Sequence, residues 1–352
     1  MVLALKNSLA RQIIERREHD TLCGQACFSD ASAGRLVYEP ECPLRSCFQH
    51  DRDRILHSKA FRRLKHKTQV FLAPEGDHYR TRLTHTLEVS QIARSVARAL
   101  LLNEDLTEAI SLGHDLGHTP FGHAGERVLN QLCSDGFHHV DQSLRVVDRL
   151  EKDGRGLNLT AEVRDGILRH SKGSGPVCGE GVELAQTLEG QIVRFADIIA
   201  YVNHDLDDAL RSGIVADTDI PIEFLEKIGS SHSRRINTLI WDMIDASQQG
   251  SKLRITLSPP MLELITQLRA WLFAHVYRVP QVQDDFDKAG RVLTELYSYF
   301  IEKPERLKDY SALCLPDDLP EKWVTDFIAS MTDRYAMKLY RDIFLPSPWA
   351  IL

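Results

Sequence analysis

Hydrophobic residues recur along most of the chain at the spacing of an α-helix. Within residues 83–102, apolar side chains stand four or five positions apart, close to the helical period of about 3.6 residues. Similar spacing predicts seven further helices, over residues 106–116, 142–151, 184–210, 231–247, 259–276, 280–301 and 320–336. Only residues 252–257 alternate between apolar and polar side chains as a short strand does. The pattern therefore predicts an all-α fold.

No internal repeat and no clear linker divides the sequence. The simplest division is a single all-α unit over residues 1–352. Its core covers residues 60–210, a C-terminal helical extension covers residues 211–352, and N-terminal helices pack around the core. The Gly-rich stretch 171–181 predicts a loop between two helices. That loop is either a plain connection or a lid over a site.

The net charge of −7 gives no global basic field that would attract nucleic acid or anionic membranes. Basic charge is local, because the segment Arg52–Lys67 holds seven Lys and Arg residues and one Asp. Such a run forms either a solvated helix face or a surface that faces a polyphosphate. No stretch reaches the roughly 18 apolar residues of a membrane span. Lys6 and Arg11 interrupt any apolar signal-peptide core, so we expect a cytoplasmic protein.

Seven cysteines are an odd number in a long chain, which predicts free thiols rather than a disulfide framework. Cys23, Cys27, Cys42 and Cys47 form two loose pairs in a turn-rich region. Their spacing differs from that of zinc fingers and ribbons, so a zinc site there is the weaker reading.

Histidines and carboxylates recur at positions that suit a metal site. His85 begins the first predicted helix, and His114 and Asp115 are adjacent at the end of the second. Asp197 lies within the apolar part of a long helix, where a buried carboxylate needs a strong partner. Two imidazoles and two carboxylates suit a divalent ion such as Mn, Mg, Fe, Co or Ni and leave positions open for water and substrate. The alternatives are a hydrogen-bonded core histidine at 85 and an Asp197–Arg194 ion pair.

The long helix carries two more polar residues on the face of Asp197. Tyr201 and Asp205 follow it at i+4 and i+8, so the three side chains share one face. A carboxylate and a phenol on one helix face are suited to hold a sugar hydroxyl by hydrogen bonds. An ordinary polar helix face is the alternative.

The segment Gly117–Gly125 contains three glycines and Pro120, so it cannot be a regular helix throughout. We expect a turn that presents His118 and His123 beside the His-Asp pair. Glu126 stands three residues after His123, where its carboxylate can orient the imidazole. Such a pair is suited to positioning an attacking water.

Five segments resemble the HD-domain dNTP triphosphohydrolases, the bacterial deoxyguanosinetriphosphate triphosphohydrolase-like proteins. They are Arg52–Phe71, Gly76–Ala93, His114–Glu126, Phe195–Asp208 and Asp326–Ala336. The resemblance implies an HD-domain helical bundle with additional N- and C-terminal helices. It also implies hydrolysis of dGTP, and of other dNTPs, to the deoxynucleoside and inorganic triphosphate by attack of a metal-associated water on the α-phosphorus.

The same resemblance assigns roles to individual residues. The implied metal ligands are His85, His114, Asp115 and Asp197. The implied catalytic residues are His123 with Glu126, and His118 and His139 near the phosphates. The implied substrate contacts are Gln69, Arg82, Tyr201 and Asp205. The sequence departs from the family in two places: Val140 follows His139 where an Asn is expected, and Ser330 replaces a Gly. Whether His138 or His139 faces the phosphates therefore stays open.

For partners, the resemblance implies a dNTP substrate and a homo-oligomer, and it leaves open a dNTP effector and single-stranded DNA. Two other functions fit parts of the pattern. An HD nucleotidase or phosphodiesterase of other specificity would share the four metal ligands without needing Gln69, Tyr201 and Asp205. A regulatory protein that responds to nucleotides or single-stranded DNA would use the site as a sensor.

Overall fold

The computed structural model describes residues 10–69, 80–171, 175, 177, 183–310 and 312–346. Over these ranges the regular elements are helices, and the only β pairings are two isolated bridges, Arg35 with Thr160 and Thr68 with Thr81. The predicted all-α fold is confirmed. None of the described helices is long and apolar enough to cross a membrane. Most of the Gly-rich stretch 171–181, and the start of the segment 76–93, lie outside the described residues.

The chain forms two compact units, and each unit draws on three separate segments. The first unit comprises Met1–Ser58, His85–His114 and Leu157–Val279. The second comprises Lys59–Thr84, Asp115–Gly156 and Pro280–Leu352. The two units therefore alternate along the sequence, and one of the boundaries falls at the peptide bond between His114 and Asp115.

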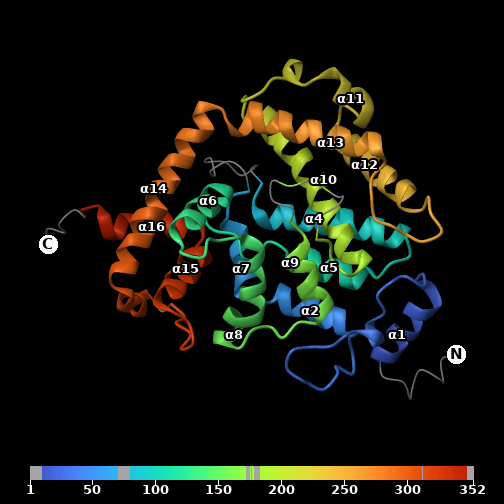
Figure 1. Ribbon diagram of the computed structural model, residues 1–352, viewed down its shortest axis with the longest axis horizontal. Helices are drawn as coiled ribbons and strands as arrows, with labels where there is room; N and C mark the ends of the chain where they lie inside the picture. The colour runs from blue at the N-terminus through green and yellow to red at the C-terminus, as the bar shows by residue number, and fades with distance from the viewer. Residues whose placement is uncertain are drawn as a thin grey trace, which may run out of the picture. The chain divides into compact units, whose positions relative to one another are not determined.

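The first unit is organised around its longest helix, α10 (Figure 1). Its main helices are α1 (Ala10–Thr21), α2 (Cys47–Leu56), α4 (Arg82–Ala99, from His85 onward), α5 (Glu104–Gly113), α9 (Ala161–Arg169), α10 (Leu188–Arg211), α11 (Ile222–Ile228), α12 (His232–Ser247) and α13 (Pro259–Leu272). Helix α10 packs against α5, α9, α12 and α13, and α5 also packs against α2. The helix is thus enclosed on several sides within its unit.

The sequence of α10 explains both its start and its burial. Thr187 caps the helix, because its side-chain oxygen accepts a hydrogen bond from the backbone nitrogen of Gly190. Ile192, Phe195 and Ile199 are almost completely buried, as the apolar spacing predicts. Polar side chains on such a helix are held at fixed positions, which suits the placement of functional groups.

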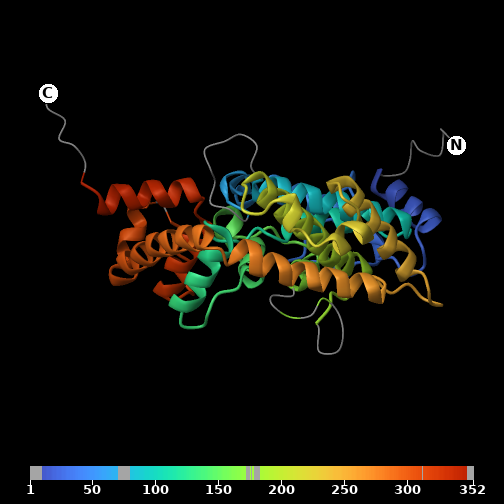
Figure 2. The same ribbon diagram turned by 90° about the horizontal axis from the view of Figure 1, so that it is seen from above.

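The second unit is built on the contacts of α14 with α6, α15 and α16. Its helices are α3 (Lys59–Arg63), α6 (Gly122–Leu132), α7 (His139–Arg145), α8 (Glu151–Gly154), α14 (Pro280–Glu302), α15 (Pro320–Ser330) and α16 (Asp333–Phe344). Figure 2 shows α16 beside α14 at the C-terminal end of the chain. Leu296, Phe300 and Ile328 lie in a continuous apolar core of this unit. Short 3-10 and π-helical segments connect the longer helices, Val146–Leu150 between α7 and α8 among them.

Three sequence predictions about elements are wrong in detail. The helix predicted over 320–336 is two helices, because Thr332 caps α16 by accepting a hydrogen bond from the nitrogen of Tyr335. The helix predicted over 142–151 changes from α to π geometry after α7. Residues 252–257 have no partner strand in the described ranges. Their alternation instead buries Ile255 and Leu257 from an extended segment.

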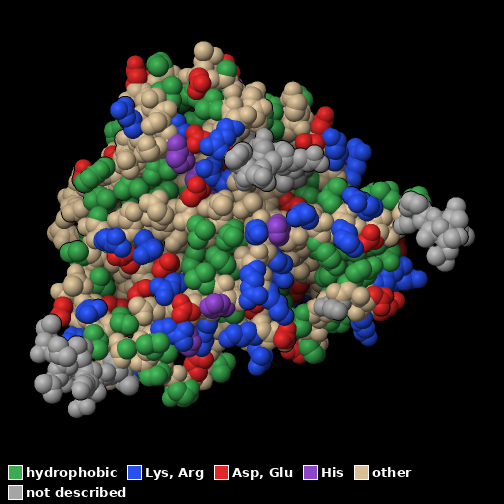
Figure 3. Space-filling model, turned by 180° about the vertical axis from the view of Figure 1, so that it is seen from behind, with side chains coloured by type: hydrophobic (Ala, Val, Ile, Leu, Met, Phe, Trp, Pro, Cys, Tyr) green, Lys and Arg blue, Asp and Glu red, His purple; other side chains and the backbone are tan. Residues whose placement is uncertain are grey.

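Two cations of the basic run Arg52–Lys67 serve the fold itself. Arg52 lies 3.1 Å from a carboxylate oxygen of Asp105 and 3.2 Å from one of Glu108, within the first unit. Lys67 is buried in the second unit and donates to the carbonyls of His118 and Ala329. Neither residue belongs to a solvated helix face. The molecular face drawn in Figure 3 carries side chains of both charges among hydrophobic ones.

Candidate active site

In the first unit, three side chains of metal-ligand type converge. His85 lies on α4, His114 caps the end of α5, and Asp197 lies on α10. One oxygen of Asp197 lies 3.1 Å from His85 Nε2 and 3.9 Å from His114 Nε2. Both imidazoles are buried, whereas the Asp197 side chain keeps 23% of its surface exposed. The sequence predicted these three side chains, together with Asp115, as the ligands of one metal ion.

The orientation of His114 is fixed by the backbone. Its Nδ1 lies 2.6 Å from the carbonyl oxygen of Ser111. A carbonyl oxygen can only accept, so Nδ1 carries the proton and Nε2 presents its lone pair toward Asp197. A ring nitrogen held in this way is the usual arrangement of a histidine that binds a metal.

Two further histidines lie next to these residues and were missed by sequence reasoning. His204 Nδ1 lies 3.4 Å from His85 Nδ1, and its Nε2 lies 3.0 Å from a carboxylate oxygen of Glu88. The ring of His170 stands edge-on to His114 at 4.9 Å. His204 is seven residues after Asp197, and this helical spacing was an available signal. His170 gave no such signal, because its approach depends on packing of α9.

Tyr201 and Asp205 occupy the α10 face that carries Asp197. Burial raises the pKa of Tyr201, despite the opposing effect of Arg269. Asp205 is buried and accepts a hydrogen bond from the hydroxyl of Tyr277, which lies in the π-helical segment Phe273–Tyr277 after α13. Sequence reasoning did not find Tyr277, since nothing in the spacing of α13 brings it to α10.

In the second unit, Asp115 is held by a cation and an imidazole. Arg82 Nη1 donates to one oxygen of Asp115 at 2.8 Å, and His118 Nε2 lies 3.2 Å from the other. Arg82 is fully buried, and its Nε and Nη2 have no partner within the described residues. Buried guanidinium donors without acceptors are costly, so these two atoms are suited to an incoming anion.

A second group in the same unit joins His118, His139 and Glu126. The rings of His118 and His139 stack at 4.0 Å, and His139 Nδ1 lies 2.8 Å from a Glu126 oxygen. Glu126 also accepts from the backbone nitrogen of His139 at 2.9 Å. His138 is exposed at the start of α7. The structure thus turns His139, and not His138, toward the other histidine and the carboxylate.

The charges of this group follow from burial and hydrogen bonding. Burial opposes ionisation of Glu126, but the neighbouring His123 and the hydrogen bond from His139 outweigh it and lower the pKa of the carboxyl group. Burial also acts against the charged form of His139, but the bond to Glu126 raises its pKa overall. Burial and the charge of Arg82 hold the pKa of His118 well below its usual value. These directions favour a charged His139 beside the Glu126 carboxylate and a neutral His118.

The turn that carries these residues is shaped by a close backbone approach. A Cβ at Gly117 would lie 2.1 Å from the backbone nitrogen of Ser143, so only glycine fits there. The turn continues to Phe121, whose φ of 62° is left-handed, and α6 then begins at Gly122. The prediction of a non-helical turn is confirmed for its first part. His123 is 70% exposed and lies 3.7 Å from Glu126 on α6.

Gln69 is the last described residue before a gap in the described ranges. Its side chain is buried, and its Oε1 has no partner within those ranges. Ser330, which replaces an expected glycine, ends α15 without a positive φ and donates to the carbonyl of Phe327 at 2.9 Å. The backbone at this position therefore does not require glycine.

Comparison with known proteins adds two family matches and close relatives. Residues 82–202 match the HD domain, and residues 255–342 match a phosphohydrolase-associated domain. A deoxyguanosinetriphosphate triphosphohydrolase-like protein of Caldanaerobacter subterraneus is 52% identical over 96% of this chain and 97% of its own. A protein of the same name from Desulfatibacillum aliphaticivorans is 51% identical over 96% of this chain and 99% of its own. One from Clostridium perfringens is 48% identical over 96% and 98%.

Proposed function

Because this chain belongs to the HD-domain family of deoxyguanosinetriphosphate triphosphohydrolase-like proteins, we propose that it hydrolyses dNTPs to the deoxynucleoside and inorganic triphosphate. The substrates would be dGTP and other dNTPs. The observation that carries the proposal is the approach of His85 and His114 to one oxygen of Asp197. This arrangement supports the metal-dependent phosphohydrolase chemistry of the HD family.

The donor set fits a divalent metal ion. Two imidazole nitrogens and a carboxylate oxygen face one another, and Ser111 holds His114 in the tautomer that leaves Nε2 available. Asp115, the residue that follows His114, would be the fourth ligand. The ion, which we take to be Mn, Mg, Fe, Co or Ni, would supply Lewis acidity toward a phosphoryl oxygen and a water molecule.

The Glu126 group would manage protons and orient water. His123, exposed and next to Glu126, would position the water that attacks the α-phosphorus. His139 is ion-paired with Glu126, and it would donate a proton to the leaving deoxyribose oxygen or stabilise the charge on it. His118, stacked on His139, would lie near the phosphates.

Substrate binding would use the remaining predicted residues. The Nε and Nη2 atoms of Arg82 would bind an α-phosphate oxygen, because its Nη1 is already committed to Asp115. Tyr201 and Asp205 would hold the 3′-hydroxyl of the sugar, and Gln69 would contact the same end of the sugar. Tyr277 would orient Asp205 through their hydrogen bond.

The proposal is tested with a panel of dGTP and the other dNTPs, assayed with Mn and with Mg, and with the products separated by chromatography. We expect deoxynucleoside and triphosphate in equal amounts. Asp115→Ala should lower turnover by about a hundredfold or more, since a metal ligand is lost. Asp141→Ala, an exposed aspartate on α7, is the matched control and should keep normal turnover. Release of monophosphate and pyrophosphate, or normal turnover in Asp115→Ala, would contradict the proposal.

The expected regulation and assembly follow only from the family. A homo-oligomer, a dNTP effector and single-stranded DNA are all part of the proposal, together with a cytoplasmic location. Light scattering measures the oligomer. A salt-dependent mobility shift of labelled single-stranded DNA measures whether the protein binds single-stranded DNA. Activity on monophosphates or cyclic nucleotides, without activity on dNTPs, would instead favour an HD nucleotidase or phosphodiesterase.

A further inference from the structure

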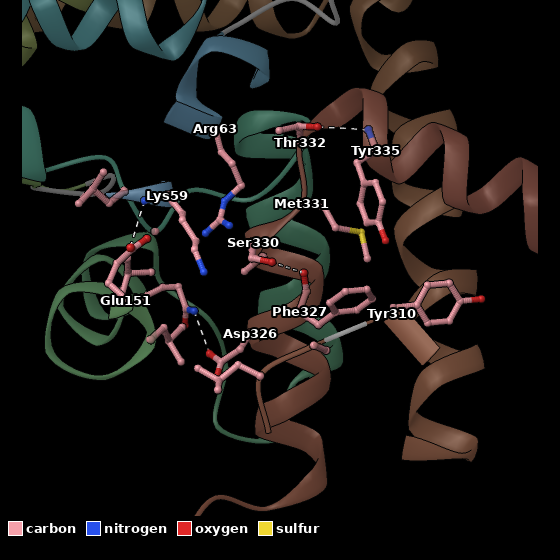
Figure 4. Close-up of a pocket in the computed structure, with 18 of the residues that line it drawn as sticks. Lys59, Arg63, Glu151, Tyr310, Asp326, Phe327, Ser330, Met331, Thr332 and Tyr335 are labelled. Atoms are coloured by element: carbon pink, nitrogen blue, oxygen red, sulfur yellow. Dashed lines mark hydrogen bonds between the residues drawn. The ribbon is translucent and has the colours of Figure 1, made fainter. Parts of the chain in front are cut away.

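The second unit contains a cavity of about 490 Å³ that the proposed reaction does not use. It is lined by residues of α3, of α7 and the segment after it, and of α15 and the turn into α16. Its volume lies within the usual range for small-molecule sites. Figure 4 shows Lys59 and Arg63 entering it from one side and Phe327, Met331 and Tyr335 facing them.

Arg63 is the chemically informative residue of this cavity. Its guanidinium group points into the cavity, toward Ser330 (Figure 4). No hydrogen bond or ion pair joins it to any residue that the structure describes, and burial lowers its pKa although the charge of Glu151 opposes this. A desolvated guanidinium offers five N–H donors in a planar fork, and such a group normally binds a carboxylate or phosphate. Among the residues that the structure describes, no carboxylate forms such a contact with Arg63.

The nearby carboxylates are already committed to other groups. Glu151 accepts hydrogen bonds from the backbone nitrogens of Lys59 at 3.0 Å and Ala60 at 2.7 Å. Asp326 is paired with Arg145 and also accepts from Gln142. The charge of Asp326 is compensated by Arg145, whereas the charge of Glu151 acts on Arg63 without forming an ion pair with it.

Lys59 supplies a second cation that is free to move. It lies one helical turn before Arg63 on α3, so both side chains share a face. Its ammonium group is 3.0 Å from Asp153, but both side chains are largely exposed. Surface pairs of this kind contribute little stability, so Lys59 can turn toward an anion at small cost.

The opposite wall is aromatic. The Phe327 ring lies 6.4 Å from that of Tyr335 and 6.1 Å from that of Tyr310, and both tyrosines line the cavity. Leu116, Val146 and Leu150 add apolar surface. A flat apolar group would bury its faces here, while polar contacts remain on the Arg63 side.

We propose that this cavity binds a phosphate monoester that carries a flat ring, with the phosphate on Arg63 and Lys59 and the ring against Phe327 and Tyr335. Two cations on one wall match the double negative charge of a phosphate monoester better than they match the single charge of a carboxylate. A nucleoside monophosphate and a phosphorylated aromatic metabolite share this chemistry. None of the four residues proposed as metal ligands lines this cavity. Binding of a phosphate monoester here does not depend on the proposed hydrolysis.

Calorimetric titration of the full-length protein tests the proposal. The probes are phenyl phosphate, dGMP, inorganic phosphate and deoxyguanosine. Phenyl phosphate should bind more tightly than inorganic phosphate, and a preference for dGMP or phenyl phosphate identifies which source supplies the ligand. Arg63→Gln should weaken binding by about tenfold or more, since charge-assisted hydrogen bonds are lost. Arg62→Gln, the exposed neighbour on α3, is the matched control and should bind normally.

Two further variants keep the result interpretable. Phe327→Leu should weaken phenyl phosphate but leave inorganic phosphate unchanged, which a general loss of folding would not produce. Asp197→Asn should stop dNTP hydrolysis yet bind phenyl phosphate as the wild type does. The proposal is overturned if no phosphate monoester binds, if Arg62→Gln and Arg63→Gln weaken binding equally, or if Asp197→Asn removes binding. Equal affinity for phenyl phosphate and inorganic phosphate would also overturn it.

Discussion

At the scale of single residues, the hydrogen-bond partner decides which of several similar side chains is suited to chemistry. His138 and His139 are adjacent in the sequence, but only His139 contacts Glu126 and stacks on His118. His114 is likewise distinguished by the Ser111 carbonyl that fixes its tautomer. The residue types could be predicted from the sequence, whereas these partners arise only when turns and helix ends are placed in space.

One residue-scale prediction concerns the ion pair between Asp207 and Arg235 in the first unit. Burial opposes the charge of Asp207, but the hydrogen bond from His232 and the charge of Arg235 lower its pKa below the ordinary 3.8. The folded state therefore favours the carboxylate. Its stabilisation is fully present above the ordinary pKa and is lost as the pH falls through the lowered folded value. Asp207→Asn should reduce the free energy of unfolding by about 1.5–3 kcal/mol at neutral pH.

Urea unfolding at neutral pH and at low pH measures this effect. The difference between wild type and Asp207→Asn should shrink as the carboxyl group of the wild type becomes protonated. Asp285→Asn removes an exposed carboxylate on α14 that pairs with Lys288, and it should have little effect at either pH. If the difference in unfolding free energy between wild type and Asp207→Asn stays constant with pH, ionisation of Asp207 does not stabilise the folded state.

At the scale of elements, the start of α16 holds the turn that precedes α6. Asp333 accepts hydrogen bonds from the backbone nitrogen of Thr68 at 2.9 Å and from that of Phe121 at 2.9 Å, and from the Thr68 hydroxyl. Phe121 has the left-handed φ of 62°, which a non-glycine residue adopts at some cost. The C-terminal helix thus stabilises the turn that carries His118.

Asp333→Ala should accordingly lower both stability and turnover. Two backbone donors would stay buried without acceptors, so we expect a loss of about 3 kcal/mol in the free energy of unfolding. In assays well below the melting temperature, kcat should fall more than the apparent affinity for dNTP, because the turn positions the catalytic histidines. Chemical unfolding and steady-state kinetics provide the two measurements. Asp342→Ala, exposed on the same helix and paired with Lys338, should change neither.

The elements themselves could be predicted where helical spacing was strong. Helices α4, α10 and α14 lie within a few residues of their predicted ranges, because their apolar faces pack against other helices. The break at Thr332 was not predicted, since the apolar spacing continues through it and only the capping hydrogen bond ends the repeat. The strand over 252–257 was predicted from alternation, which an extended segment also shows when it buries every second residue.

At the scale of the whole molecule, the sequence suggests contiguous parts, whereas the two compact units interleave along the chain. The boundary at residue 210 therefore stays a prediction. Most of the candidate site residues came from motifs in the chain, but Tyr277, His170 and His204 did not. Tyr277 and His170 belong to elements whose approach is set by tertiary packing, and no local spacing encodes such an approach. His204 lies on the same helix as Asp197, so its spacing was a signal that the sequence offered.

Metal binding should connect the candidate site to the stability of the whole protein. A ligand that binds only the folded state stabilises it by about 2.7 kcal/mol at a concentration of roughly 100 times its Kd. Adding Mn to protein treated with a chelator should therefore raise the melting temperature by several degrees, and EDTA should reverse the rise. Asp197→Asn should lose the rise, because the oxygen that faces His85 and His114 is replaced by an amide.

The exposed Asp141→Asn protein should keep the full Mn-dependent rise in melting temperature, which controls for weak binding of Mn to surface carboxylates. Differential scanning calorimetry across a range of Mn concentrations separates specific from general binding, because only a specific site saturates. An equal rise in wild type and Asp197→Asn would place the ion elsewhere and remove the basis for metal-dependent hydrolysis at Asp197. A rise confined to proteins with an intact Asp197 would link the ion to the same carboxylate that the two imidazoles approach.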